Sequence, residues 1–284
     1  MRILLIDGKT QLGTALVQTL PKESDRSLVT VADPRDPAAL TEAAACDVIV
    51  LCVSADGDVL DVVDAMAPAL RPGSIVIDCS TVSAATAREA ARRLAARSVE
   101  FLDAPVSGGV EGARDGTLAI MVGGARDAFE RAQPVLAAMG RAVTHFGPSG
   151  SGQAAKATNQ IMCAGIIQAV GEAMAFAKAE GLPLEALIDT LGKGAGSSWY
   201  FVNRAPNMVR GSYPPGFRVR LHEKDLRICH DMAARHGVQL PVVEMTLLHY
   251  RKLIEQGHGD EDISTIFRLK DAMFASASPG NEVR

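Results

Sequence analysis

The sequence predicts a doubly wound α/β domain with a Rossmann-type parallel sheet, followed by an all-helical domain that a long interdomain helix opens. The first domain is predicted because short apolar runs alternate with Ala- and Leu-rich helical segments, and the runs are apolar at nearly every position. Continuous apolar strands are typical of a parallel sheet that helices cover on both faces. The second domain is predicted because residues 151–180 contain no proline.

The expected elements of the first domain follow in order along the chain. The expected strands are 3–6, 28–31, 48–51, 74–77, 99–102 and 118–122. The expected helices are 11–20, 37–45, 58–70, 84–96 and 126–139. This alternation is the pattern of a doubly wound sheet. Turn residues at 147–150 end it, so we expect a dinucleotide-binding, Rossmann-like domain at residues 1–149.

The long helix begins at Ser151 and ends before Gly181, where Leu182-Pro183 follows. A helix of this length spans roughly 45 Å. Gly165 and Gly171 inside it lower helix stability unless a neighbour packs closely against them. Further helices are expected near 184–191, 224–236, 242–256 and 264–273. Residues 150–284 are therefore expected to form a helical substrate and dimerisation domain.

Composition and charge exclude several classes of function. The 284 residues include 29 Lys and Arg against 33 Asp and Glu, without a basic block, which argues against nucleic acid as a partner. The apolar strand runs are far shorter than the ~20 residues of a membrane span, and the first residues lack the features of a signal peptide. Five cysteines without metal-ligand spacing argue against disulfides and against a metal site, and Cys52 and Cys79 are expected to be small buried hydrophobes. We expect a cytoplasmic protein without a membrane partner.

The turn after the first strand carries part of a phosphate-binding fingerprint. A dinucleotide fold has G-x-G-x-x-G here, so that the backbone and a helix N-terminus approach the pyrophosphate. This chain has Gly8 and Gly13 at the outer positions but Thr10 at the second, so an ordinary strand-to-helix turn is an equal interpretation. Asp33 ends the next strand, where an acidic residue binds a ribose 2′-hydroxyl and favours NAD over NADP. Arg35 could reverse that preference, and a plain turn residue is the alternative for Asp33.

The most informative stretch is residues 103–118, D-A-P-V-S-G-G-V-E-G-A-R-D-G-T-L. It leaves a predicted strand at its carboxyl end, where open α/β sheets bind ligands. Ser107 offers a hydroxyl, and Gly108 and Gly109 leave backbone N–H groups unobstructed, so the three residues can form a concave site for a carboxylate. A glycine-rich surface loop is the ordinary alternative for such a triplet.

Lys156 and Asn159 lie three residues apart in the first turns of the long helix, which places them on one face. Oxidation of an alcohol requires removal of the hydroxyl proton as the hydride leaves. A lysine can remove it if burial lowers the lysine pKa from about 10.4 toward 7–8. Asn159 can hydrogen-bond the substrate oxygen and fix its orientation. Taken alone, a solvated lysine beside an asparagine is the commoner explanation of K-x-x-N.

Together these motifs resemble the β-hydroxyacid dehydrogenases, which include 3-hydroxyisobutyrate dehydrogenase, tartronate semialdehyde reductase and the glyoxylate/succinic semialdehyde reductases. The resemblance covers nearly the whole chain in order. Besides 103–118 it rests on D-C-S-T at 78–81, G-Q-A-A-K-A-T-N-Q at 152–160 and K-D-L at 224–226. It implies that residues 107–109 hold the substrate carboxylate and that Lys156 is the catalytic general acid/base. It also implies that Thr81 contacts the nicotinamide side of the cofactor.

The resemblance further implies that Lys224 reaches toward cofactor and substrate, although Lys224 could equally cap a helix start with Asp225. Three departures from the family pattern lie in the cofactor half of the chain. They are Thr10 in the glycine-rich turn, Ser54 where the family has proline, and a region between Asp33 and Cys46 that is shortened as though a helix and a strand were removed. The predicted cofactor-binding residues are Gly8, Thr10, Leu12, Gly13, Asp33, Val53, Ser54, Thr81 and Lys224.

The sequence thus predicts an NAD-dependent oxidoreductase, with NADP as the alternative cofactor, that interconverts a small 3-hydroxy acid and its semialdehyde. Tartronate semialdehyde, 3-hydroxyisobutyrate and succinic semialdehyde all fit. We expect a small carboxylate as partner and a homodimer or homotetramer as the assembly. Thr10 and Ser54 leave a first alternative open, namely a non-catalytic binding protein of the same family that has lost the dinucleotide. An imine reductase is a second alternative, but such relatives generally lack the lysine that is present here as Lys156. A structural or assembly protein is a third alternative.

Overall fold

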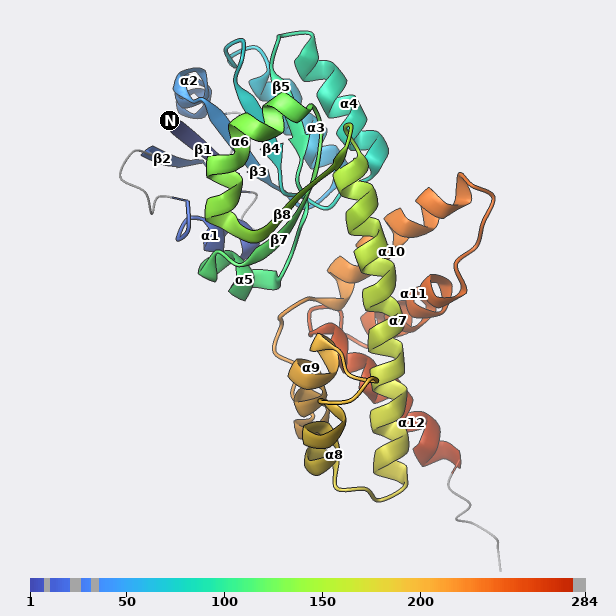
Figure 1. The fold of residues 1–284 in the computed structure, drawn as a ribbon. Helices are drawn as coiled ribbons and strands as arrows, with labels where there is room; N and C mark the ends of the chain where they lie inside the picture. The colour runs from blue at the N-terminus through green and yellow to red at the C-terminus, as the bar shows by residue number, and fades with distance from the viewer. Residues whose placement is uncertain (8–10, 21–26, 32–35, 278–284) are drawn as a thin grey trace, which may run out of the picture. The chain divides into compact units, whose positions relative to one another are not determined.

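The computed structural model describes residues 1–7, 11–20, 27–31 and 36–277 (Figure 1). The chain divides into two compact units, Met1–Ala157 and Thr158–Arg284. The first unit holds a sheet with its helices, and the described part of the second is helical. Helix α7 (Ser151–Ala179) is unbroken and belongs to both (Figure 1). The predicted fold class is confirmed, whereas the ligand roles assigned to residues 1–149 and 150–284 stay predictions.

The first unit is built on an eight-stranded mixed sheet. Its strands are β1 (Arg2–Asp7), β2 (Ser27–Val31), β3 (Val48–Cys52), β4 (Ile75–Asp78), β5 (Glu100–Asp103), β6 (Val106–Ser107), β7 (Leu118–Gly123) and β8 (Gly140–Gly147). Their order is β2-β1-β3-β4-β5-β7-β6, with β8 paired to β7. Strands β1 to β5 are parallel to one another, as the sequence predicts.

The sheet departs from the parallel arrangement at β7, which runs antiparallel to β5 and β6. The link from β6 to β7 holds only the short helix α5 (Gly109–Asp115). This link is shorter than the dozen or more residues that a parallel crossover needs, so the chain turns back beside β6. The sequence predicted neither β6 nor α5, because β6 has only two residues and the short α5 begins at a pair of glycines. Strand β8 returns parallel to β7 after a full helical crossover.

Helices cover both faces of the sheet. On one face, Ile3 and Leu5 belong to a buried cluster that includes side chains of α1 and α6. On the other face, Leu4 and Ile6 pack with side chains of α2, α3 and α4. Since successive strand residues point to opposite faces, a strand that is covered on both must be apolar throughout. The remaining helices of this unit are α1 (Gln11–Leu16), α2 (Pro37–Ala45), α3 (Asp56–Met66), α4 (Ala84–Ala95) and α6 (Arg126–Met139).

Strand β2 is the last strand on its side of the sheet within the described residues. Helix α2 follows it and leads directly to β3. Asp36 caps α2 by accepting the Ala38 N–H at 2.9 Å, and Pro37 takes the first helical position. The described residues between β2 and β3 therefore form one helix and no strand. The shortening relative to the family stays a prediction.

The helical unit contains five helices after α7 within its described residues. They are α8 (Leu184–Leu191), α9 (Trp199–Arg210), α10 (Val219–Ala234), α11 (Pro241–Glu255) and α12 (Phe267–Ala277), the last preceded by a 3₁₀ turn at Ile263–Ile266. Helix α9 was not predicted, because its aromatic start and internal Pro206 obscure the helical pattern. Ser198 caps α9 by accepting the Phe201 N–H at 3.0 Å.

Close packing against the glycines of α7 is confirmed at one of the two positions. A Cβ added at Gly171 would lie 3.3 Å from Ile266 and 3.4 Å from Lys270, so this glycine lets α12 and its preceding turn approach α7. At Gly165 the nearest atom, on Val242, would lie at 3.6 Å, which is ordinary contact. Gly165 therefore has no packing reason in the described structure.

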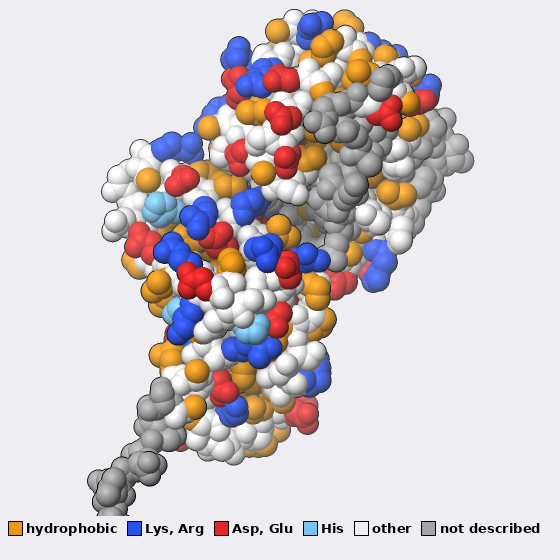
Figure 2. All heavy atoms as spheres, turned by 180° about the vertical axis from the view of Figure 1, so that it is seen from behind, with side chains coloured by type: hydrophobic (Ala, Val, Ile, Leu, Met, Phe, Trp, Pro, Cys, Tyr) orange, Lys and Arg blue, Asp and Glu red, His pale blue; other side chains and the backbone are white. Residues whose placement is uncertain are grey.

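Helix α7 is, among the described helices, the one long and apolar enough to cross a membrane by length and composition. Half of its most apolar stretch is buried, and the core helix of a folded domain meets the same criterion. Figure 2 shows basic and acidic side chains interspersed over one face of the helical unit. Ion pairs of this unit include Arg220 with Asp260 and Arg227 with Glu223. The expected absence of membrane and nucleic-acid partners stays a prediction.

Candidate active site

The loops that follow β3 and β4 are joined at the carboxyl edge of the parallel strands. Val53, directly after β3, donates its N–H to Ser80 Oγ at 2.9 Å. The Ser80 N–H in turn donates to Asp78 Oδ1 at 2.9 Å, which fixes the start of the loop after β4. Thr81 is half-buried in that loop, and Ser54 is exposed in the other. The structure therefore brings together three residues that the sequence assigned to the cofactor, Val53, Ser54 and Thr81.

The other predicted cofactor positions in this unit follow β1 or β2 in the sequence. Gly8, Thr10 and Asp33 lie outside the described residues. Leu12 and Gly13 lie in α1, where Gly13 is buried. Helix α1 follows β1 closely, which is the strand–turn–helix order that a dinucleotide pyrophosphate requires. The described residues at this edge, with the hydroxyls of Ser54 and Thr81, fit a dinucleotide.

The predicted carboxylate site joins β6 to α5. Ser107 is half-buried, and Gly108 and Gly109 are exposed. The φ angles of the two glycines are +130° and +66°, a region that glycine adopts without strain and other residues avoid. A Cβ on Gly108 would also lie 3.2 Å from the Leu118 side chain. Because the glycines carry no side chains, a ligand can approach this backbone closely, as the carboxylate prediction requires.

Lys156 forms a hydrogen bond to the strand that carries Ser107. Its side chain is buried, with 7% of the residue exposed, and its Nζ donates to the backbone oxygen of Val106 at 2.8 Å. Val106 directly precedes Ser107 in β6. The alternative of a solvated surface lysine is therefore wrong. The Lys156 amine lies beside the candidate carboxylate site, although 50 residues separate Lys156 from Val106.

Asp103, at the end of β5, was not singled out by the sequence analysis. It is fully buried, and its carboxylate accepts the N–H groups of Gly150 at 2.7 Å and Gln153 at 2.9 Å. Burial raises the pKa of Asp103, and these backbone donors act against the rise. A negative charge is also favourable at a helix N-terminus, here that of α7. A charged residue closing a buried strand was the signal in the sequence, since a buried charge needs partners.

Asn159 and Lys224 have described contacts within the helical unit. The half-buried Asn159 donates from Nδ2 to Gln160 Oε1 at 2.8 Å and contacts Cys163 Sγ at 3.6 Å. Lys224 Nζ lies 3.1 Å from Asp225 Oδ1. The alternative in which Lys224 caps a helix start is wrong, because α10 begins five residues earlier, at Val219. The roles of Asn159 toward substrate and of Lys224 toward cofactor stay predictions.

The cysteines offer no reactive thiol at the sheet. Cys52 and Cys79 are buried, as expected for small hydrophobes, and burial raises the pKa of the Cys79 thiol well above its usual range. None of the five cysteines, all of which are described, forms a disulfide. Within the described part of the chain, no group of three or more His, Cys, Asp or Glu side chains could hold a metal ion.

A Rossmann-type sheet, a helical unit and a buried lysine beside a glycine-rich segment define an NAD(P)-dependent oxidoreductase. Residues 14–147 match the family described as NAD binding domain of 6-phosphogluconate dehydrogenase. Residues 150–270 match the family described as NAD-binding of NADP-dependent 3-hydroxyisobutyrate dehydrogenase. The chain belongs to the β-hydroxyacid dehydrogenase family, as its motifs indicated. The first match begins after the turn in which Thr10 departs from the fingerprint.

Individual relatives agree with this membership. An uncharacterised oxidoreductase of Synechocystis sp. is 40% identical over 229 residues, which are 80% of this chain and 78% of that protein. The NAD-dependent L-serine dehydrogenase of Pseudomonas aeruginosa is 35% identical over 215 residues, 73% of this chain and 72% of that protein. A solved structure of Mycobacterium tuberculosis 3-hydroxyisobutyrate dehydrogenase with L-serine matches with a TM-score of 0.84 at 29% identity. That match covers 95% of this chain and 99% of the other.

Proposed function

We propose that the protein interconverts a small 3-hydroxy acid and its semialdehyde with NAD, and with NADP as the alternative cofactor. The observation that carries the proposal is the 2.8 Å hydrogen bond from Lys156 Nζ to the oxygen of Val106. It holds an amine one residue from Ser107, the start of the candidate carboxylate site. A substrate whose carboxylate binds there has its reacting oxygen only two carbons further on, within reach of the amine.

A nicotinamide dinucleotide, when bound at the loops after β3 and β4, would supply the hydride chemistry of the proposed reaction. The side chains hold the substrate and move the proton. The Ser107 hydroxyl and the N–H groups of Gly108 and Gly109 bind the carboxylate. During oxidation, neutral Lys156 takes the hydroxyl proton as the carbonyl forms, and during reduction its ammonium returns that proton to the aldehyde oxygen. Asn159 orients the same oxygen.

The names of relatives support this substrate class. Relatives at 30–37% identity are named for L-serine, L-threonate and 2-(hydroxymethyl)glutarate. Each of these acids carries a hydroxyl on a carbon β to a carboxylate. We therefore place these three acids beside 3-hydroxyisobutyrate and tartronate semialdehyde as candidate substrates. Succinic semialdehyde, which is reduced to a 4-hydroxy acid, is a candidate with one more carbon between the carboxylate and the reacting group. The buried, lysine-bearing site supports a dehydrogenase over the imine reductase alternative.

A substrate panel with both cofactors tests the proposed function. We expect initial rates of NADH formation with at least one 3-hydroxy acid, and no rate with a matched 2-hydroxy acid that lacks the β-hydroxyl. Because Asp33 would repel a 2′-phosphate, we expect NAD to be preferred about tenfold or more, equal to about 1.4 kcal/mol.

The other outcomes of the panel separate the alternatives. Turnover of a cyclic imine alone would favour the imine reductase. If fluorescence titration detects binding of neither NADH nor NADPH, the protein is a binding relative and the proposed reaction is wrong.

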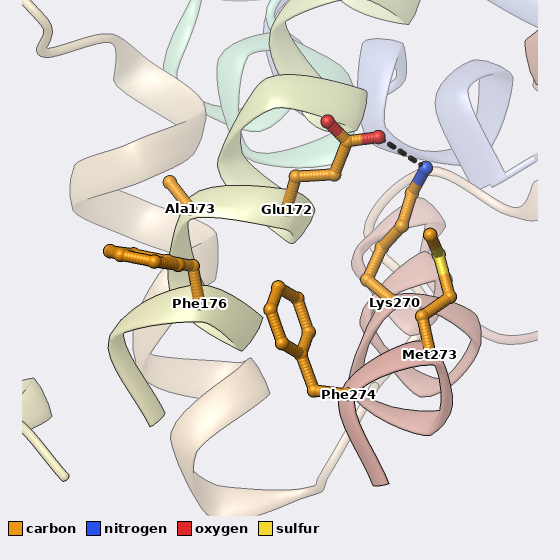
Figure 3. Close-up of a pocket in the computed structure, with 6 residues that line it drawn as sticks. All are labelled: Glu172, Ala173, Phe176, Lys270, Met273 and Phe274. Carbon is orange, nitrogen blue, oxygen red and sulfur yellow. Dashed lines mark hydrogen bonds and ion pairs between the residues drawn. The ribbon is translucent and has the colours of Figure 1, made fainter. Parts of the chain in front are cut away.

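We also propose a homodimer or homotetramer, which large exposed apolar side chains on the helical unit support. Met162 and Phe176 of α7 and Met273 of α12 are each more than half exposed. Figure 3 shows Phe176 and Phe274 facing one another in a pocket that the bond from Lys270 to Glu172 borders. Such apolar patches are typical of protein interfaces.

We also propose a cytoplasmic location, which is supported by the absence of disulfides among the five cysteines.

A further inference from the structure

We infer that Gln153 is a positioning residue for the reaction: its side chain locks the turn of α7 that carries Lys156 to the loop that carries Thr81. The inference rests on the proposed function, in which Lys156 moves the proton and Thr81 contacts the cofactor. Gln153 acts through these two residues, because the polar atoms of its side chain bond to backbone groups.

The amide of Gln153 brackets Thr81 from both sides. Its Nε2 donates to the backbone oxygen of Ser80 at 2.8 Å, and its Oε1 accepts the N–H of Val82 at 3.2 Å. Only 1% of Gln153 is exposed, so water does not compete for these bonds. The donor and the acceptor of the amide therefore both bond to the backbone of one loop segment, residues 80–82.

The backbone of Gln153 is fixed as firmly as its side chain. Its N–H donates to Asp103 Oδ2 at 2.9 Å, so the first turn of α7 is held on the end of β5. Lys156 lies three residues further along, on the same face of the helix, and bonds to the oxygen of Val106. A single residue thus ties the position of the amine to the position of the cofactor loop.

The bonds of Gln153 connect with those of the loop after β3. Ser80, whose backbone oxygen binds Gln153, accepts the Val53 N–H on its side chain at 2.9 Å. The loops after β3 and β4 and the first turn of α7 therefore form one hydrogen-bonded frame. Ser107, where the carboxylate site begins, is held by the pairing of β6 with β7. Loss of the Gln153 amide should displace the cofactor loop relative to Lys156 and leave the carboxylate site in place.

Gln153→Leu tests the inference, because leucine fills a similar volume without either hydrogen bond. The matched control is Gln168→Leu on the same helix, since Gln168 is 3% exposed and bonds to Thr246 Oγ1 at 3.1 Å. Both variants should lose stability. Only Gln153→Leu should lose kcat, by about 10- to 100-fold, because displacement of a reacting group by about 1 Å costs up to that factor. The KM for the hydroxy acid should stay close to that of the wild type.

Two further readouts do not require turnover. In Gln153→Leu the amide of Val82 should exchange hydrogen for deuterium faster, and the affinity for NADH should fall. Wild-type kcat in Gln153→Leu, or an equal loss of kcat in both variants at equal loss of Tm, would overturn the inference. A wild-type protein that turns over no acid of the panel would instead defeat the proposed function. In that case unchanged NADH affinity and unchanged Val82 exchange in Gln153→Leu would overturn the inference as well.

Discussion

Replacing Lys156 with methionine is expected to lower kcat by about 10²- to 10⁴-fold and to leave NADH binding largely intact. Methionine fills the buried volume of the lysine stem but carries no proton for the reacting oxygen. Only 7% of Lys156 is exposed and its Nζ is held at 2.8 Å from the oxygen of Val106, so bulk water cannot easily take its place. Initial rates give kcat, and fluorescence titration gives the NADH affinity.

The control for this variant is Lys178→Met on the same helix. Lys178 is about half exposed and forms a surface ion pair with Asp271 at 2.7 Å, so its loss should leave kcat unchanged. A Lys156→Met protein that keeps wild-type kcat would refute the assignment of Lys156 as the general acid/base. Loss of NADH binding together with kcat would show that Lys156 serves the cofactor rather than the proton transfer.

Gly152→Ala is expected to destabilise the fold by about 3 kcal/mol or more. A Cβ at Gly152 would lie 2.5 Å from the backbone oxygen of Asp103 and would also overlap the backbone oxygen of Met121. Neither backbone atom can move aside as a flexible side chain could, because both belong to the buried sheet. The first turn of α7 would have to leave β5, and the hydrogen bonds from Gly150 and Gln153 to Asp103 would be strained or lost.

Gly165→Ala on the same helix is the matched control. The nearest atom to its Cβ would lie at 3.6 Å, and alanine is the better helix former, so this variant should be neutral or up to about 1 kcal/mol more stable. Urea unfolding of the two variants and the wild type measures both effects. Equal stability of Gly152→Ala and Gly165→Ala would show that α7 does not pack against the sheet as described.

The parts of the fold that local pattern determines could be predicted from the sequence. The bounds of α2, α6 and α8 match the expected ones at both ends. Their apolar periodicity marks them, and in α2 the capping residue Asp36 also marks the start. The strands β3 and β4 could be predicted because both are buried at every position, which makes them apolar except at Asp78. Strand β6 and helix α5 could not, since β6 is two residues long and α5 starts at consecutive glycines.

Of the candidate site, too, the sequence indicates only the residues that stand in recognisable local motifs. Residues 107–109 and Lys156 could be proposed from the sequence, because each stands in a motif with a chemical reason for its residue types. Their roles stay predictions. Asp103 and Gln153 could not be proposed from the sequence, because their roles come from contacts between segments far apart in the chain. The bond from Asp103 to Gly150 spans 47 residues, and that from Gln153 to Ser80 spans 73. Only the folded chain shows which backbone groups these buried side chains meet.

A crystal structure of the protein with NADH and the best 3-hydroxy acid of the panel tests the central claim most directly, because this pair cannot react. We predict that the carboxylate lies within hydrogen-bond distance of Ser107 Oγ and of the N–H groups at residues 108 and 109. We also predict that Lys156 Nζ contacts the substrate hydroxyl. A carboxylate bound elsewhere, with the Lys156 amine making no contact with the substrate, would contradict the proposed mechanism.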